Sequence, residues 1–169
     1  PMKSSFLFSK DISAVRIAAI EWHAEPLFAG TIMHELGHAL YFKAQKKSSI
    51  AKPGTRAYVD EEVDMHLMEM DVLDAATDHK FLQYIDSIVD RTGKVDDFDS
   101  LVGSITSDDM QALSDLLGCN GQCSGEEANI LFACIVTSLG FRYAQVYADD
   151  PREEMIKFYN YCTRELSHL

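Results

Sequence analysis

With 169 residues, the chain has the size of a single domain that can bury a substantial core. Its formal net charge is −12 at pH 7, with 47% hydrophobic and 25% charged residues, which is the composition of a water-soluble globular protein. This negative charge disfavours binding to a polyanion, so we expect no nucleic-acid partner. Residues 1–169 are predicted to form one globular domain.

The N-terminal part of the chain contains a predicted strand and no recognisable export signal. Residues 6–8 form an apolar run that is too short for the core of a signal peptide. Residues 11–22 are apolar without a decisive period, and we interpret them as a strand rather than a short helix. His23, just before Pro26, is interpreted as a surface or capping histidine rather than a functional one.

Residues 34–38 read His-Glu-Leu-Gly-His. On a helix, His34 and His38 lie about 40° apart on one face and one turn apart along the axis, so both imidazoles can reach a single cation. Glu35 points about 100° away, which places its carboxylate beside a water on that cation, where a general base belongs. The motif therefore predicts His34 and His38 as metal ligands and Glu35 as the catalytic base.

The motif is predicted to lie in a helix over residues 26–46. Pro26 suits the first turn of this helix, and a cluster of lysines suits its C-terminal end. Gly37 costs about 1 kcal/mol of helix propensity relative to alanine, so we expect a neighbouring element or a substrate to approach its backbone closely. The residues expected to form the core face, opposite the histidines, are Phe28, Ala29, Ile32, Leu36, Ala39 and Leu40.

A second, acidic helix from about residue 60 onward is predicted to complete the metal site. The pair Pro53-Gly54 marks the loop that brings the chain back. Glu62 lies beside an apolar flank, as a third zinc ligand would, and is the preferred ligand, while Glu61 and Glu69 stay open as rivals. The residues expected on the solvated side of this helix are Asp60, Asp64 and Asp71.

The rest of the chain is predicted to be helical, over residues 79–89, 96–102, 107–117, 124–147 and from Pro151 onward. Residues 128–147 are long enough to span a membrane, but polar residues and Gly140 interrupt them, so we interpret them as a core helix and expect no membrane span. The fold class is therefore predicted as α+β and predominantly helical, with at most a small sheet. A catalytic core is expected over about residues 11–90 and a helical remainder over about residues 95–169.

The chain has few cysteines for its length. Cys134 lies in an apolar run, where a free thiol behaves as a small hydrophobe. Cys119 and Cys123 have the wrong spacing for the usual zinc knuckle. We expect reduced cysteines, with a local disulfide between Cys119 and Cys123 as the alternative.

Two segments carry a resemblance to a known group of enzymes. Residues 32–40 read Ile-Met-His-Glu-Leu-Gly-His-Ala-Leu, and residues 62–64 read Glu-Val-Asp. The chain thereby resembles the zincin metallopeptidases, and among them the gluzincins, in which a glutamate from a following helix completes the site. The local motif is most similar to ImmA/IrrE-type peptidases. Metzincins fit badly, because Tyr41 and Ala44 stand where that branch has Gly and His.

The resemblance covers about residues 28–73 and implies a zincin-like pair of active-site helices that bind Zn²⁺. It implies a zinc-dependent endopeptidase that cleaves a protein or peptide substrate with a metal-activated water. Secreted bacterial toxin and effector metalloproteases share the same minimal plan, so the expected location is the cytoplasm or, after specialised secretion, a host cytosol. The residues implied as ligands are His34, His38 and Glu62, with Glu35 as the base.

The donor that would stabilise the oxyanion is not fixed by the motif. Tyr58 and His66 are the preferred catalytic candidates for this role, with His23 behind them. His66 stands where an aromatic residue is common in the ImmA/IrrE-type peptidases, and it could instead orient a ligand carboxylate. The alternative function is a zinc-stabilised regulatory or protein-binding module without proteolytic activity, although such a module has no need of Glu35.

Overall fold

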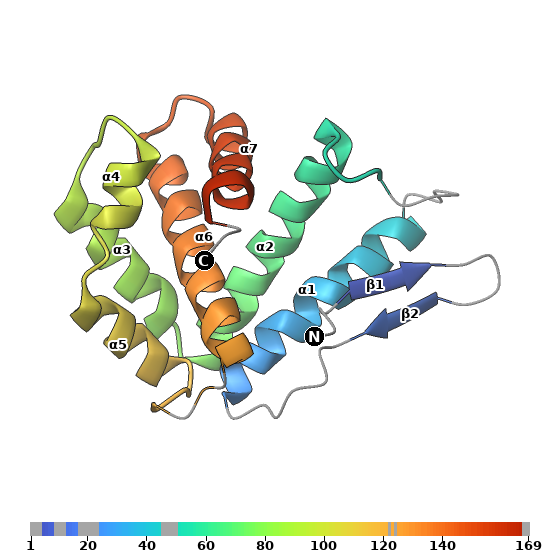
Figure 1. The fold of residues 1–169 in the computed structure, drawn as a ribbon, viewed down its shortest axis with the longest axis horizontal. Helices are drawn as coiled ribbons and strands as arrows, with labels where there is room; N and C mark the ends of the chain where they lie inside the picture. Colours follow the sequence, from blue (N-terminus) through green and yellow to red (C-terminus); the bar gives the residue numbers. More distant parts are fainter. Residues whose placement is uncertain are drawn as a thin grey trace.

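The computed structural model describes residues 5–8, 13–16, 24–44, 51–121, 123 and 125–166, and these residues are predominantly helical (Figure 1). The predominantly helical class predicted from the sequence is therefore confirmed. In chain order the elements are β1 (Ser5–Phe8), β2 (Ser13–Arg16), α1 (Glu25–Ala44), α2 (Arg56–Ala76), α3 (Lys80–Thr92), α4 (Phe98–Gly103), α5 (Ser107–Leu116), α6 (Gly125–Tyr147), α7 (Pro151–Tyr161) and a short π-helix, η1 (Cys162–Leu166).

The N-terminal half consists of α1 and α2, which lie side by side, and a two-stranded sheet that contacts α1 (Figure 1). β1 pairs antiparallel with β2, with Phe6 opposite Val15. The strand predicted within residues 11–22 is confirmed over Ser13–Arg16. Residues 17–23, which include His23, lie outside the described residues. The sequence pattern does not predict β1, because four residues carry too short an alternation to recognise.

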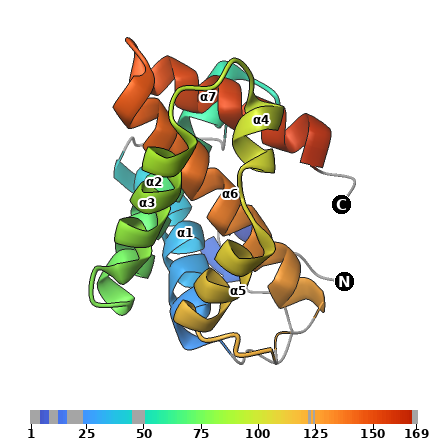
Figure 2. The same ribbon diagram turned by 90° about the vertical axis from the view of Figure 1, so that its left-hand side faces the viewer.

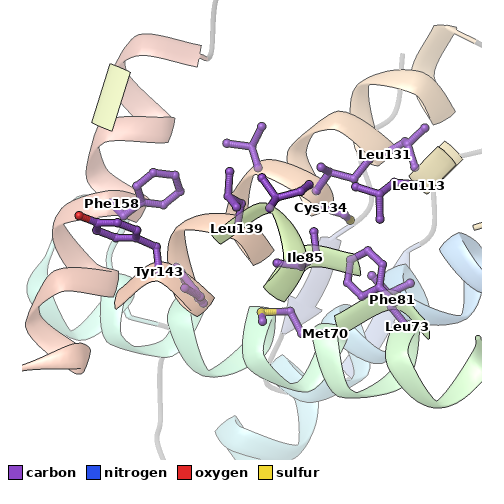
Figure 3. Close-up of a cluster of buried hydrophobic side chains, with 14 of the residues drawn as sticks. Met70, Leu73, Phe81, Ile85, Leu113, Leu131, Cys134, Leu139, Tyr143 and Phe158 are labelled. Carbon is purple, nitrogen blue, oxygen red and sulfur yellow. The ribbon is translucent and has the colours of Figure 1, made fainter. Parts of the chain in front are cut away.

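The C-terminal helices pack around α6, which contacts α3, α4, α5 and α7 (Figure 1, Figure 2). Buried apolar side chains of α2, α3, α5 and α7 meet those of α6 and form one core (Figure 3). By length and composition α6 could cross a membrane, but 61% of its most apolar 18-residue window is buried inside the fold. This burial favours a core helix, while the lack of a membrane span stays a prediction. The labelled core residues are Met70, Leu73, Phe81, Ile85, Leu113, Leu131, Cys134, Leu139, Tyr143 and Phe158.

Side-chain caps determine where several helices begin. Asp97 caps α4 and Asp150 caps α7, each by accepting a backbone N–H of the first turn. Pro151 lies in the first turn of α7, as predicted. The helix predicted to begin at Asp96 begins at Phe98, because Asp97 rather than Asp96 is the cap.

Asp109 joins α3 to α5. Its carboxylate accepts hydrogen bonds from the Arg91 guanidinium at 2.7 Å, from the Tyr84 hydroxyl at 3.2 Å and from the backbone N–H of Thr106 at 2.8 Å. Burial raises the pKa of this carboxyl, but the hydrogen bonds from Arg91 and Thr106 outweigh burial and lower the pKa to about 2. The ionised form of Asp109 therefore stabilises the contact between the two helices.

The core face predicted for α1 is wrong. Leu36 and Leu40 are 40% and 59% exposed, and the other four residues of that predicted face are only partly buried. The reason is that α2 packs on the side of α1 that carries the histidines, which the helix periodicity alone does not reveal. The buried residues of α1 are Leu27, Gly30, Thr31, Glu35 and Gly37.

The expectation of reduced cysteines is wrong for Cys119 and Cys123, which form a disulfide with Cα atoms 5.1 Å apart. Gly118, Asn120 and Gly121 have positive φ angles, and this turn brings the two cysteines together. Cys134 and Cys162 are free, as expected, and Cys134 is buried.

Candidate metal and catalytic site

Two histidines of α1 face one glutamate of α2. Nε2 of His34 lies 3.5 Å from Oε2 of Glu62, and Nε2 of His38 lies 3.6 Å from Oε1 of the same carboxylate. The two imidazole rings are 5.1 Å apart between centroids. The site thus brings together the three residues that the sequence predicts as ligands, each with a donor atom directed at the same space.

These donors have the spacing of a metal site. The three donor atoms lie within 4.8 Å of one another. Zinc ligands at about 2.0–2.2 Å from the ion in tetrahedral geometry are roughly 3.3–3.6 Å apart, which matches both histidine–carboxylate distances. Two imidazoles and one carboxylate are also a donor set that zinc prefers when a further position stays open. The residues present therefore fit a zinc ion.

Glu61 takes a different position from Glu62. Its Oε1 lies 3.0 Å from Nδ1 of His38, on the ring nitrogen that faces away from Glu62. A carboxylate in this position fixes the orientation of a ligand histidine and directs its other nitrogen at the metal. In this geometry Glu61 orients His38 rather than competing with Glu62.

Glu69 lies beside Nδ1 of His34, whereas Glu62 lies beside Nε2 of the same ring. Its Oε2 is 3.0 Å from Nδ1 of His66 and 3.5 Å from Nδ1 of His34, while its Oε1 accepts a hydrogen bond from the Cys134 thiol at 3.2 Å. Nδ1 of His34 is buried and makes no hydrogen bond despite this proximity. The rings of His34 and His66 are 4.5 Å apart. His66, predicted as an oxyanion donor or an orienting residue, therefore lies on the side of His34 that faces away from Glu62.

The charges of the site stabilise one another. Burial lowers the pKa of His34, but the carboxylates of Glu62 and Glu69 outweigh it and raise the pKa to about 10. Burial likewise raises the pKa of Glu62, but His34 and His38 outweigh it and lower the pKa to about 2. The carboxylates of Glu62 and Glu69 thus favour a positive charge at His34.

Glu35 is 8% exposed, and its carboxyl group interacts electrostatically with His34 and His38. Burial raises the pKa of its carboxyl, and the two histidines oppose this shift. A raised pKa brings a carboxylate closer to the range in which a general base works at neutral pH. The position and environment of Glu35 therefore suit the role predicted for it.

Charged residues join α7 to the first half of α2. Arg152 donates to Oδ1 of Asp64 and to the backbone oxygen of Asp60, both at 2.6 Å. Nη1 of Arg56 lies 2.8 Å from Oε2 of Glu153. Asp60 and Asp64 are predicted on a solvated face, and they remain 33% and 39% exposed there while pairing with Arg152. These pairs lie between α7 and the part of α2 that contains Glu62.

Two tyrosines lie beside Glu62: Tyr58 comes from α2, as Glu62 does, and Tyr159 comes from α7. Burial raises the pKa of both phenols, and the Glu62 carboxylate raises it further. Both phenols are protonated at neutral pH and can donate hydrogen bonds. Tyr58 is one of the predicted oxyanion donors, whereas the sequence pattern assigns Tyr159 only to the apolar stripe of the last helix.

Two glycines allow the close approach of α1 and α2. A Cβ atom on Gly37 would overlap the sulfur of Met65, and one on Gly30 would lie 2.7 Å from Cδ2 of Leu73. The expected close approach at Gly37 is therefore confirmed. It brings the histidines of α1 within reach of carboxylates on α2.

No protein-family model, curated protein or solved structure matches this chain. The resemblance to zincin metallopeptidases accordingly rests on the residues of α1 and α2.

Sequence reasoning did not anticipate the roles of Tyr159 and Cys134. Both lie on helices far along the chain, and each looks like a core residue in its own segment. Tyr159 is the one hydroxyl-bearing side chain in its predicted stripe of Met155, Phe158, Tyr159, Cys162 and Leu166, which is the only local signal of a polar role. Cys134 has no such signal in its apolar run.

Proposed function

We propose that the chain is a zinc-dependent endopeptidase that cleaves a protein or peptide substrate. The observation that carries this proposal is the position of the Glu62 carboxylate, whose two oxygens face Nε2 of His34 and Nε2 of His38. The buried Glu35 on the same helix supports it, because a site that bound zinc only for stability would not need this carboxylate.

When bound, zinc supplies Lewis-acid chemistry, polarising a peptide carbonyl and making a water more acidic. Glu35 takes a proton from the attacking water on its carboxylate and then delivers it to the nitrogen of the leaving amine. The phenols of Tyr58 and Tyr159 donate hydrogen bonds to the oxygen that becomes negative during attack. Glu61 keeps His38 in a fixed orientation through its Nδ1 atom.

The hairpin beside α1 provides a way to hold an extended substrate. Among the described residues β1 and β2 pair only with each other, so within this part of the chain the outer edge of each strand has no strand partner. A peptide that adds to such an edge is bound mainly through its backbone, which leaves its side chains to determine specificity. A peptide bound in this way lies next to the helix that carries His34, Glu35 and His38.

The test is proteolysis by zinc-loaded protein. The purified chain is incubated with a mixture of unfolded proteins, with and without a chelator, and new N-termini are identified by mass spectrometry. We expect cleavage that the chelator abolishes and that zinc restores. As a matched control, His79→Ala removes an exposed histidine that pairs with Asp74 far along α2, and it should cleave like wild type. Zinc binding through His34 and His38 without any cleavage would favour the alternative, a zinc-stabilised regulatory or protein-binding module.

A further inference from the structure

A second set of metal donors lies next to the first and shares one residue with it. Donor atoms of His34, His66 and Glu69 lie within 4.8 Å of one another. The two histidine nitrogens that face Oε2 of Glu69 are Nδ1 of His66 at 3.0 Å and Nδ1 of His34 at 3.5 Å. Ligands of a tetrahedral zinc ion are separated by roughly 3.3–3.6 Å, so small shifts would place all three donors on an ion.

The shared histidine points independently to a ligand at this position. Nδ1 of His34 is a buried polar atom without a hydrogen-bond partner. Such atoms are rare in folded proteins, because leaving one unpaired costs about 1–3 kcal/mol. Oε1 of Glu69 accepts a hydrogen bond from the thiol of Cys134, while its Oε2 lies 3.0 Å from Nδ1 of His66 and 3.5 Å from Nδ1 of His34. An ion beside Oε2 would satisfy Nδ1 of His34 directly.

The balance of charge also favours a second cation. Glu35, Glu61, Glu62 and Glu69 are all less than 9% exposed. Buried charges are costly unless they are compensated. A second divalent ion would compensate part of this buried negative charge, and Nδ1 of His34 would release its proton to solvent when it binds that ion.

We propose that His34, His66 and Glu69 bind a second divalent transition-metal ion on the Nδ1 side of His34, so that this imidazole bridges two ions. The proposal rests on the proposed function for the first ion, held by His34, His38 and Glu62. The second ion lies deeper than the first, toward Cys134 of α6. Its binding joins α1 and α2 at a second point and is expected to stabilise the folded chain.

The experiment measures how many zinc ions the folded chain binds. Metal-free protein is saturated with Zn²⁺, passed through a desalting column and analysed for metal and protein, with circular dichroism to confirm the fold. We expect two ions per chain in wild type, one in His66→Ala, one in His38→Ala and none in His34→Ala. Glu69→Gln should also bind one ion, and the exposed His79→Ala should bind two.

These variants separate the two sites. One ion in wild type that persists in His66→Ala and is lost in His38→Ala overturns the second site and leaves the first intact. Two ions in His66→Ala place the second ion elsewhere and also overturn the proposal. If metal content is unchanged in His38→Ala and in His34→Ala, the proposed function fails as well. Proton release during the second half of the zinc titration should disappear in His66→Ala, which a purely structural role of His66 would not explain.

Discussion

The different positions of Glu61 and Glu62 lead to different losses of zinc affinity when each is changed. Glu62 faces both ligand histidines, so Glu62→Ala removes a ligand of the first ion. Structural zinc in small peptides is bound with roughly 10–16 kcal/mol through four ligands, or roughly 2.5–4 kcal/mol for each ligand. We therefore expect Glu62→Ala to weaken zinc binding by roughly 10²–10³-fold.

Glu61→Gln should have a smaller effect that acts through His38. Oε1 of Glu61 lies 3.0 Å from Nδ1 of that histidine. Loss of a carboxylate that orients a ligand histidine typically weakens metal binding by about 10–100-fold. In a His38→Ala background, Glu61→Gln should therefore have little further effect.

The assay is competition for Zn²⁺ against a chelator of known affinity, with every variant made in a His66→Ala background, in which only the first ion is expected to bind. Thermal melts of the metal-free proteins control for loss of the fold. A larger loss of affinity in Glu61→Gln than in Glu62→Ala would refute the assignment of the third ligand. Additive effects of Glu61→Gln and His38→Ala would refute the argument that Glu61 acts by orienting His38.

Three further predictions concern catalysis and stability. Glu35→Gln should retain zinc and its melting temperature but lose cleavage by roughly 10² or more, and loss of zinc in this variant would instead make Glu35 a ligand. The Cβ of Gly37→Ala would overlap the sulfur of Met65, and this cost of about 1–3 kcal/mol exceeds the gain of about 1 kcal/mol in helix propensity, so the free energy of unfolding should fall by up to about 2 kcal/mol in urea titrations. Gly103→Ala, with nothing within 4 Å of the added Cβ, should not lower it. The folded pKa of Asp109 is lowered from 3.8 to about 2, so its ionised carboxylate stabilises the fold above pH 3.8, and this stabilisation is lost as the pH falls through 2. The free energy of unfolding of Asp109→Asn should therefore decrease less between pH 3.8 and pH 2 than that of wild type. An equal decrease in both proteins would contradict this account.

The sequence by itself determined the local features of this protein. The spacing of His34 and His38 places them on one side of a helix wherever that helix packs, because 3.6 residues per turn is a local property of the backbone. Two other features are also local: Gly54, with its positive φ angle, forms the turn before α2, and Pro151 begins α7. These features depend on neighbours within a few residues, so a pattern in the sequence predicts them.

Only the tertiary structure decided which helix face is buried and which carboxylate meets which histidine. The apolar face with Leu36 and Leu40 looks like a core face by periodicity, yet it is partly exposed because α2 covers the opposite side. Glu61 and Glu62 are neighbours in sequence, and their separate positions follow from the register in which α2 packs on α1. The place of Tyr159 beside Glu62 depends on how α7 packs against α2 and α6, about a hundred residues from Glu62 in the chain, and no local pattern carries information about contacts across that distance.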